Sequence, residues 1–497
     1  MANSSAPPIY SLATELYYQI ANYLNNDNKY DVLSLLKVSR RFKPVAEAVL
    51  YPKIAVYGGE DTDAWSNMPL FLRTMLDRPD LARKVKSLAF GTMCMNVSDT
   101  DLDHFEENNL REMCLEKILN MGYTKGHPWY QMVVSSFESA LGGLLLSVLP
   151  NLVQLKLTIF DGQLVPTPYS NDPLYGLFGT YQPPAAALAC FQNITHLIIP
   201  GGHLQLLPLG FPNLVHLDIY KAHEFDLRRI HGPGSLRSGF NLRSLSIHIP
   251  WEIVDPDFHE SFRVRLADLF KALGCKVLRK LELVLCRKSP HEETLVTPDY
   301  AWLTEDLQVL AGSLEELAVR AVRLEPELTF PSFQGNPPIN SLREFAALRK
   351  LVITQDILQD IDESMIDLAL FLPPNLRELE IDTPRENIDQ WFEHLWAEKE
   401  QFPHLRLVQL ACWNDLMPPD QRSAQEFPQS SYFRQSEDSV WSKLQDVGIT
   451  VQVVRRPTGQ TRIFSQKRAQ AERFDELEDG HDDIPQWTQV FDLESNA

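Results

Sequence analysis

Apolar residues recur along most of the chain in one short phrase. It consists of an apolar residue, two variable residues, a leucine, one variable residue and a second apolar residue. Because side chains alternate between the faces of a β-strand, the last two apolar residues share one face of a short predicted strand. The apolar residue three positions earlier turns the corner into the same core. Clear copies are Asn151–Leu157, Asn193–Ile199, Asn213–Ile219, Asn241–Ile247, Val277–Leu283, Ser313–Val319, Ala347–Ile353, Asn375–Ile381 and His404–Leu410, with a weaker copy at Lys84–Phe90.

One such unit is too small to bury its own apolar face, so units of this kind stack side by side. Stacked strands form a parallel sheet, which needs a crossover segment between neighbours. The central residues of the phrases are mostly 20 to 42 residues apart, which matches or exceeds the period of a leucine-rich repeat. We therefore predict an α/β fold in which residues 80–455 form an irregular leucine-rich-repeat solenoid of parallel strands with helical or loop crossovers. The alternative, strands of an ordinary mixed α/β domain, does not explain the shared internal spacing.

The segments between the phrases differ in character. Phe262–Leu273 has apolar residues at helical spacing, and Gly274 ends the pattern; Glu305–Leu310 and Ile361–Leu372 are similar. Residues 95–140 and 161–190 do not fit the period and are interpreted as irregular insertions. Val447–Val454 alternates like a closing strand, and residues 456–497 are predicted to be a polar, acidic and disordered tail.

Residues 9–55 lack the phrase and have helical periodicity instead. Leu16, Ile20, Tyr23 and Leu24 recur at helical spacing, a second helix begins near Asp31, and a third follows with a proline near its start. A bundle of this size is near the lower limit for independent stability, so it is expected to lean on a neighbour or a partner.

This N-terminal pattern resembles the F-box family. The phrase from Leu36 to Phe42, with Val38-Ser39-Arg40-Arg41-Phe42, and the later Leu50-Tyr51 look like F-boxes of fungal proteins. Ala13 departs from the proline that usually follows the first leucine of the family. The other matching residues are Leu12, Glu15, Leu16, Ile20, Tyr23, Leu24, Asp31, Leu33 and Ala46.

The resemblance implies a substrate-recognition adaptor of an SCF-type ubiquitin ligase. The F-box would dock on a Skp-type adaptor, which joins it to a cullin–RING ligase, and the repeats would hold a protein substrate for ubiquitination. Apolar side chains would supply the adaptor contact or the helical core beneath it, two roles that the sequence does not separate. These residues are Leu12, Leu16, Ile20, Leu24, Leu33, Leu36, Val38 and Phe42.

Specificity for the substrate is expected from the residues that stand between the two apolar positions of each phrase. They point away from the apolar core and toward the concave face of a solenoid. The predicted substrate-binding residues are Lys156, Asp218, Ser246, Glu282 and Glu380, together with the neighbouring aromatic Tyr220. Because these residues vary in charge and size, they do not identify a substrate.

Charge and motifs narrow the class of protein. The net charge of −20 disfavours nucleic acid or an anionic membrane as the main partner. The most apolar stretch, Leu141–Leu149, is too short to span a bilayer, and we read no secretory signal at the N-terminus. The six cysteines show no C-x-x-C spacing, and no catalytic motif is found.

We therefore predict a non-enzymatic protein of the cytoplasm or nucleus, without a cofactor or a metal site. Two alternatives stay open. One is a leucine-rich-repeat scaffold that takes no part in ubiquitin ligation, and the other is an enzyme with an unrecognised site in one of the insertions.

Overall fold

The computed structural model describes residues 12–27, 29–38, 40–56, 68–93, 109–160, 173–180, 183–209, 211–220, 241–250, 266–287, 300–323, 339–358, 367–382, 384, 388–413 and 440–456. The chain forms two compact units. The first contains the described residues up to Ile198 together with Gln205–Asn213, and the second contains Ile199–Leu204 and the described residues from Leu214 onward. The division falls within β4 (His196–Pro200) and the 3-10 helix η2 (Gly201–Leu209).

The first unit begins with three helices and continues with alternating strands and helices. Each of the first three helices packs against the other two. Pro44 lies at the start of the third, where its missing N–H costs no hydrogen bond. The elements are α1 (Thr14–Asp27), α2 (Lys29–Val38), α3 (Lys43–Leu50), β1 (Lys53–Val56), α4 (Met68–Asp77), α5 (Pro79–Ala82), β2 (Ser87–Met93), α7 (Leu110–Asn120), α8 (Pro128–Val134), α9 (Glu138–Val148), β3 (Gln154–Phe160), α10 (Pro173–Phe178) and α11 (Ala185–Phe191).

Helix α9 is the centre of the first unit. It contacts α4, α7, α8, α10, α11 and β2, and its residues from Glu138 to Leu146 are all buried. A helix that is covered on every side is apolar all round, which accounts for the apolar stretch at Leu141–Leu149. Within the described part of the chain, no helix combines the length and the apolarity needed to cross a membrane.

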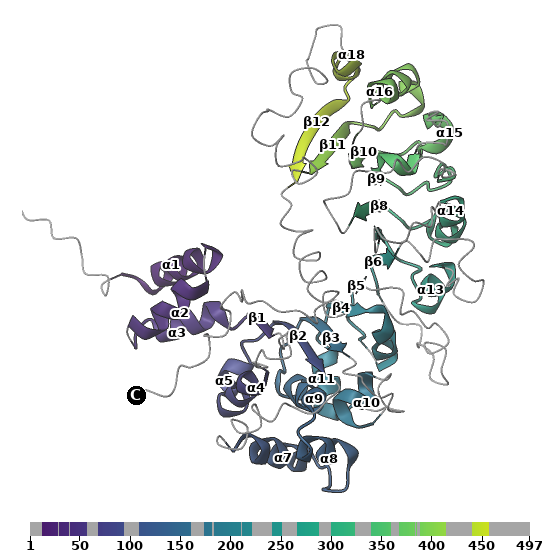
Figure 1. Ribbon diagram of the computed structural model, residues 1–497. Helices are drawn as coiled ribbons and strands as arrows, with labels where there is room; N and C mark the ends of the chain where they lie inside the picture. Colours follow the sequence, from purple (N-terminus) through teal and green to yellow (C-terminus); the bar gives the residue numbers. More distant parts are fainter. Residues whose placement is uncertain are drawn as a thin grey trace, which may run out of the picture. The chain divides into compact units, whose positions relative to one another are not determined.

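The second unit repeats one arrangement, in which a strand is followed by helical or irregular chain and then by the next strand. Helices α13 to α16 follow one another along the same side of the strands (Figure 1). The elements are β5 (His216–Tyr220), β6 (Ser244–Pro250), α13 (Leu266–Ala272), β7 (Lys280–Arg287), α14 (Ala301–Leu307), η5 (Gln308–Leu310), β8 (Glu316–Arg323), β9 (Lys350–Thr354), η6 (Gln355–Leu358), α15 (Leu368–Phe371), β10 (Glu378–Asp382), α16 (Ile388–Ala397), η7 (Lys399–Gln401), β11 (Leu407–Trp413), α18 (Val440–Asp446) and β12 (Thr450–Arg456).

All twelve strands belong to one sheet whose order follows the chain from β1 to β12. Every pairing described in detail is parallel, and the central leucines lie in register. In the first unit Leu88 pairs with Leu155, and Leu155 pairs with Leu197. In the second unit the aligned row is Leu217, Leu245, Leu281, Leu317, Leu351, Leu379, Val408 and Val451. The sequence prediction of stacked parallel strands is confirmed, and the fold is compatible with a solenoid-like α/β architecture.

In several repeats the corner combines a buried leucine with an asparagine before it. The corner residues Leu152, Leu214 and Leu376 are at most 1% exposed. This asparagine donates its side-chain amide to a backbone carbonyl of the preceding repeat. Asn151 donates to Arg83 at 2.8 Å, and Asn375 donates to Ala346 at 2.9 Å. Where it is present, the asparagine therefore links its repeat to the preceding one by a hydrogen bond.

Several crossovers match the predictions. Within the predicted helix at 262–273, the described part is α13, and Gly274 ends it with a φ of +62°. The segment 305–310 is covered by the end of α14 together with η5, and the predicted closing strand at 447–454 corresponds to β12. Of the predicted helix at 361–372, only α15 lies within the described residues.

The interpretation of 95–140 and 161–190 as irregular insertions was wrong for their described parts. The first contains α7, α8 and the beginning of α9, and the second contains α10 and most of α11. These helices pack around α9, so they form the core of the first unit. The sheet also begins earlier than residue 80, because β1 pairs in parallel with β2. The tail from 457 onward lies outside the described residues.

The close approach of α9 to α10 gives a first prediction. A Cβ on Gly143 would meet the carbonyl oxygen and carbonyl carbon of Leu177, which are backbone atoms that do not move aside easily. We expect Gly143→Ala to lower the free energy of unfolding by about 1–3 kcal/mol, the usual cost of overpacking, although alanine is the better helix former. Urea unfolding followed by circular dichroism measures the change. Gly312→Ala, where a Cβ has open space, is the control, and equal midpoints for the two variants would contradict the prediction.

Candidate protein-binding surfaces

The three N-terminal helices enclose a small core. Tyr17 and Ala21 from α1 lie against Phe42 and Val45, and the rings of Tyr17 and Phe42 meet edge to face with centroids 5.0 Å apart. The guanidinium of Arg41 lies over the Tyr17 ring, 5.2 Å from its centroid. Leu12, Leu35 and Val49 pack against this cluster.

Helix α1 carries a second apolar stripe beside the one that faces this core. Leu16 and Tyr23 are 41% and 68% exposed, and Ile20 and Leu24 beside them are half-buried. These residues follow the i, i+4, i+7 and i+8 spacing that places side chains on one face of a helix. Val38, the last residue of α2, is 60% exposed. The unit therefore presents large apolar side chains to solvent.

The structure shows which of these N-terminal apolar residues are buried and which are exposed. Phe42 is a core residue and Leu12 packs against the core. Leu16 and Val38 are exposed. The half-buried members are Ile20, Leu24, Leu33 and Leu36.

Two buried side chains and one exposed aromatic of these helices were missed by the sequence reasoning. Tyr17 and Val32 are at most 2% exposed, and Tyr18 is 39% exposed. Every residue of the run Leu16-Tyr17-Tyr18 is apolar or aromatic. The local pattern therefore did not say which face of α1 points inward.

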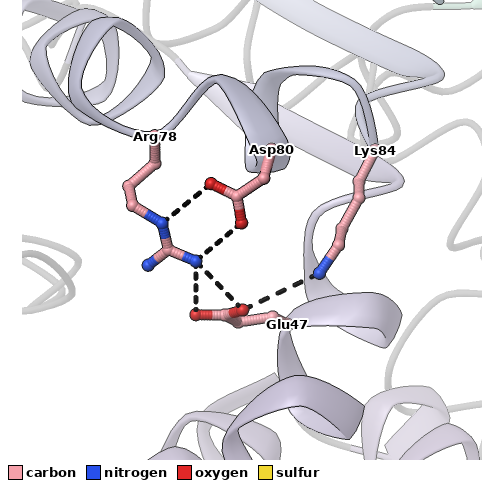
Figure 2. Close-up of polar contacts among 4 residues, drawn as sticks. All are labelled: Glu47, Arg78, Asp80 and Lys84. Carbon is pink, nitrogen blue, oxygen red and sulfur yellow. Dashed lines mark hydrogen bonds and ion pairs between the residues drawn. The ribbon is translucent and has the colours of Figure 1, made fainter.

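A buried carboxylate joins the three helices to the first strand–helix repeat (Figure 2). Glu47 on α3 has a side chain only 9% exposed, and it lies 3.4 Å from the Arg78 guanidinium and 3.7 Å from the Lys84 ammonium. Arg78 also pairs with Asp80 at 2.8 Å. The Asp80 carboxylate, as a hydrogen-bond acceptor, raises the pKa of the Arg78 guanidinium, and Arg78 in turn lowers the pKa of Asp80 to about 2.

The backbone continues this connection. Only Tyr51 and Pro52 stand between the end of α3 and the start of β1, and the carbonyl of Pro52 accepts hydrogen bonds from the N–H groups of Lys86 and Ser87 at 3.0 and 2.9 Å. The strand that follows α3 is thus the first strand of the sheet. Within this unit, the three helices are held to β2 by both side-chain and backbone contacts.

The predicted substrate-binding positions lie on the face of the sheet opposite the leucines. In the second unit Asp218, Ser246 and Glu282 are aligned on neighbouring strands, and the same row continues through Ala318 and Val352 to Glu380. Tyr220 is half-buried and ends β5, two residues after Asp218. Lys156 lies on β3 in the first unit, where it pairs with Ile198. The structure therefore aligns four of the six predicted residues in one row.

An arginine that was not predicted organises the charges of this face. Arg320 on β8, with a side chain 11% exposed, lies 3.3 Å from Glu282 on β7, 3.5 Å from Glu380 and 3.3 Å from Asp382 on β10. Glu380 and Asp382 are themselves only 4% and 2% exposed. Glu380 is therefore a buried partner of Arg320, in contrast to the half-exposed Glu282.

On the same face, the Asp218 carboxylate lies 3.7 Å from Nε2 of His248. Both side chains are partly exposed, at 29% and 20%. Together with Glu282, they are partly exposed polar side chains of this face. The face suits the recognition of another protein through polar contacts.

Three of the cysteines are apolar packing elements. Cys114, Cys190 and Cys275 are buried free thiols, and burial raises the pKa of both Cys190 and Cys275 to about 12. A thiol with so high a pKa is protonated at neutral pH and is a poor nucleophile or metal ligand. In the described part of the chain, no group of three His, Cys, Asp or Glu side chains is arranged to hold a metal ion.

The junction in Figure 2 gives the second prediction. Arg78→Met leaves the buried Glu47 carboxylate with the more distant Lys84, so we expect the free energy of unfolding to fall by about 1–3 kcal/mol, the cost of an under-satisfied buried polar group. Asp80→Asn is the matched control. Asp80 is exposed, and exposed ion pairs contribute little to stability. Urea unfolding of both variants tests this, and an equal or larger effect of Asp80→Asn would contradict it.

The charges around Arg320 give the third prediction. Arg320→Met removes the guanidinium from two buried carboxylates, and breaking a buried ion pair in this way costs about 3 kcal/mol. Arg279→Met, directly before β7, breaks only the exposed pair between Arg279 and Glu315, and we expect a loss below about 1 kcal/mol. The two unfolding free energies are compared by urea titration. Similar values for the two variants would show that Arg320 is not a structural centre of this face.

Comparison with known proteins adds no relative to this description. No protein-family model matches the chain, and no curated protein matches it. The candidate surfaces therefore rest on the residues of this chain alone: an exposed apolar stripe on three N-terminal helices, and a polar sheet face in the second unit.

Proposed function

We propose that this protein is a substrate-recognition adaptor of an SCF-type ubiquitin ligase. In this proposal the three N-terminal helices are an F-box that binds a Skp-type adaptor, and the repeats are leucine-rich repeats that bind a protein substrate. Ubiquitin transfer itself takes place on the other subunits of the complex. The chain serves to bring a substrate to them and needs no catalytic group.

The exposed apolar stripe of α1 is the observation that carries the proposal. Leu16 and Tyr23 are large side chains that face solvent although Tyr17 and Ala21, on the same helix, complete the core of the unit. Burial of such a side chain contributes about 1.5–3 kcal/mol, so an uncovered stripe of this kind favours a protein partner. The residues that match the F-box pattern include Leu16, Ile20 and Leu24 of this stripe.

The junction at Glu47 supports the same function. An adaptor of a ligase must hold its substrate at a defined distance from the other subunits, and a flexible connection would not do so. Here α3 leads into β1 after two residues, and Glu47 pairs with Arg78 and Lys84. Both features favour a fixed connection between the adaptor-binding helices and the first strands of the repeat sheet.

The substrate is assigned to the sheet face that carries Asp218, Ser246 and Glu282. These side chains are half-buried and lie in register on β5, β6 and β7. A parallel sheet spaces them at about 4.8 Å from strand to strand, so the face offers a regular array of polar groups to an extended surface of a partner.

The fourth prediction concerns adaptor binding. We expect Leu16→Asp and Val38→Asp, each made in the full chain, to weaken binding to the host's Skp-type adaptor at least tenfold, because each places a charge where the partner buries an apolar side chain; tenfold corresponds to about 1.4 kcal/mol. A pull-down with purified adaptor, followed by isothermal titration calorimetry, measures the change.

Asn22→Asp is the matched control, since Asn22 is exposed on the same helix and lies neither three nor four residues from any member of the stripe. It adds the same charge and is expected to bind as the wild type does. Circular dichroism shows whether each variant is folded. A folded wild-type chain that does not bind the adaptor would overturn the proposal and leave a repeat scaffold with a different partner.

A further inference from the structure

A row of arginines lies directly before the strands of the second unit. The residue after each corner leucine donates its backbone N–H to the carbonyl of the equivalent residue one strand earlier. The distances are 2.8 Å from Arg377 to Arg349 and 3.0 Å from Arg406 to Arg377. We call Arg349, Arg377 and Arg406 the arginine row; they precede β9, β10 and β11. The ladder continues toward β6 through Glu315, Arg279 and Arg243.

The three arginines of the row differ from the other basic residues around them. Arg279 pairs with Glu315 at 3.6 Å, Lys280 with Glu316 at 3.6 Å, and Lys350 with Glu378 at 3.1 Å. The arginine row is exposed, and none of its members has an ion pair or side-chain hydrogen bond with a carboxylate. This holds for the described part of the chain.

The three arginines of the row precede neighbouring strands, so their positive charges repel one another. Neighbouring parallel strands lie about 4.8 Å apart, and like charges directly opposite one another destabilise a sheet. The chain as a whole carries a net charge of −20, so it has ample carboxylates to neutralise three arginines. A row of like charges whose members have no ion-pair partner among the described residues is a surface suited to an acidic, extended polypeptide.

The sequence contains an acidic segment soon after the last described strand. Residues 472–483 include seven Asp or Glu and one Arg, and they lie outside the described residues. The last described strand, β12, ends at Arg456 beside β11. The fifteen residues 457–471 separate it from the acidic segment and reach about 50 Å when extended.

The extended length of residues 457–471, about 50 Å, exceeds the distance from the end of β12 to the arginine row. β12 has seven residues, and a strand of this length measures about 23 Å. From β12 to β9, three strands away, the sheet adds about 15 Å. The acidic segment therefore reaches every member of the arginine row without leaving its own chain, and tethering gives it an effective concentration in the millimolar range.

We infer that the arginine row is a binding surface for an extended acidic segment, and that residues 472–483 of the same chain occupy it. The inference is independent of the proposed ligase function, because it requires only the row, the segment and the tether between them. Occupation by its own tail covers this end of strands β9 to β11, and an acidic partner competes with the tail for it. The attraction between exposed charges is screened by salt.

The fifth prediction tests the surface and its occupant together, with a fluorescein-labelled peptide of residues 472–483 as the probe. Fluorescence anisotropy measures its binding to the full chain and to a full chain in which the seven acids of the segment are replaced by Asn or Gln. We expect the peptide to bind the neutralised chain at least tenfold more tightly than the wild type, whose own segment competes.

Adding R349S, R377S and R406S to the neutralised chain should weaken peptide binding at least tenfold. The control adds K37S, R83S and K125S, which remove the same charge from exposed positions of the first unit, and should bind as the neutralised chain does. Equal binding by the wild type and the neutralised chain would overturn occupation by the tail. Equal binding by the row and control variants would overturn the surface itself.

Discussion

The stacking of apolar side chains from strand to strand is the interaction on which the rest of this structure depends. A single strand with one leucine-rich face has nothing to bury that face against, and its edges expose unpaired backbone groups. In register, Leu281, Leu317 and Leu351 form part of a continuous apolar row, and the corner leucines extend it. The helices then have one side of the sheet to cover (Figure 1). The opposite face is left to polar residues.

The beginning of the sheet shows how a small helical unit is attached to such an array. The core around Tyr17 and Phe42 is small, and helical units of this size have little stability of their own. β1 follows α3 directly and pairs with β2, while Glu47 accepts charge-assisted contacts from Arg78 and Lys84 (Figure 2). The three helices thus draw stability from the sheet and still expose Leu16, which the proposed function uses.

The charges of the second unit fall into three environments with different consequences. Exposed pairs such as Lys350 with Glu378 neutralise each other across adjacent strands and contribute little to stability. Arg320 is nearly buried among three carboxylates and holds β7, β8 and β10 in one network. The side chains of the arginine row have no ion-pair partner among the described residues. One repeated backbone geometry thus supports paired, buried and uncompensated charge, according to which side chains its strands bring together.

The sequence by itself determined strands β2 to β12, their register and the orientation of their side chains, because these follow from a local period that recurs in copy after copy; β1 was not predicted. Leu155 and Leu245 were assigned to the core and Asp218 to the opposite face on this ground. The helices at 110–148 were missed, since their pattern is set by packing around α9 and has no repeat. Only the tertiary structure decided that Phe42 is core and Leu16 exposed, and that Glu380 is buried. Burial of this kind depends on contacts between residues that are distant in the chain. Glu47 and Arg78 are 31 positions apart, and Arg320 and Asp382 are 62 positions apart. A local period carries no information about such partners.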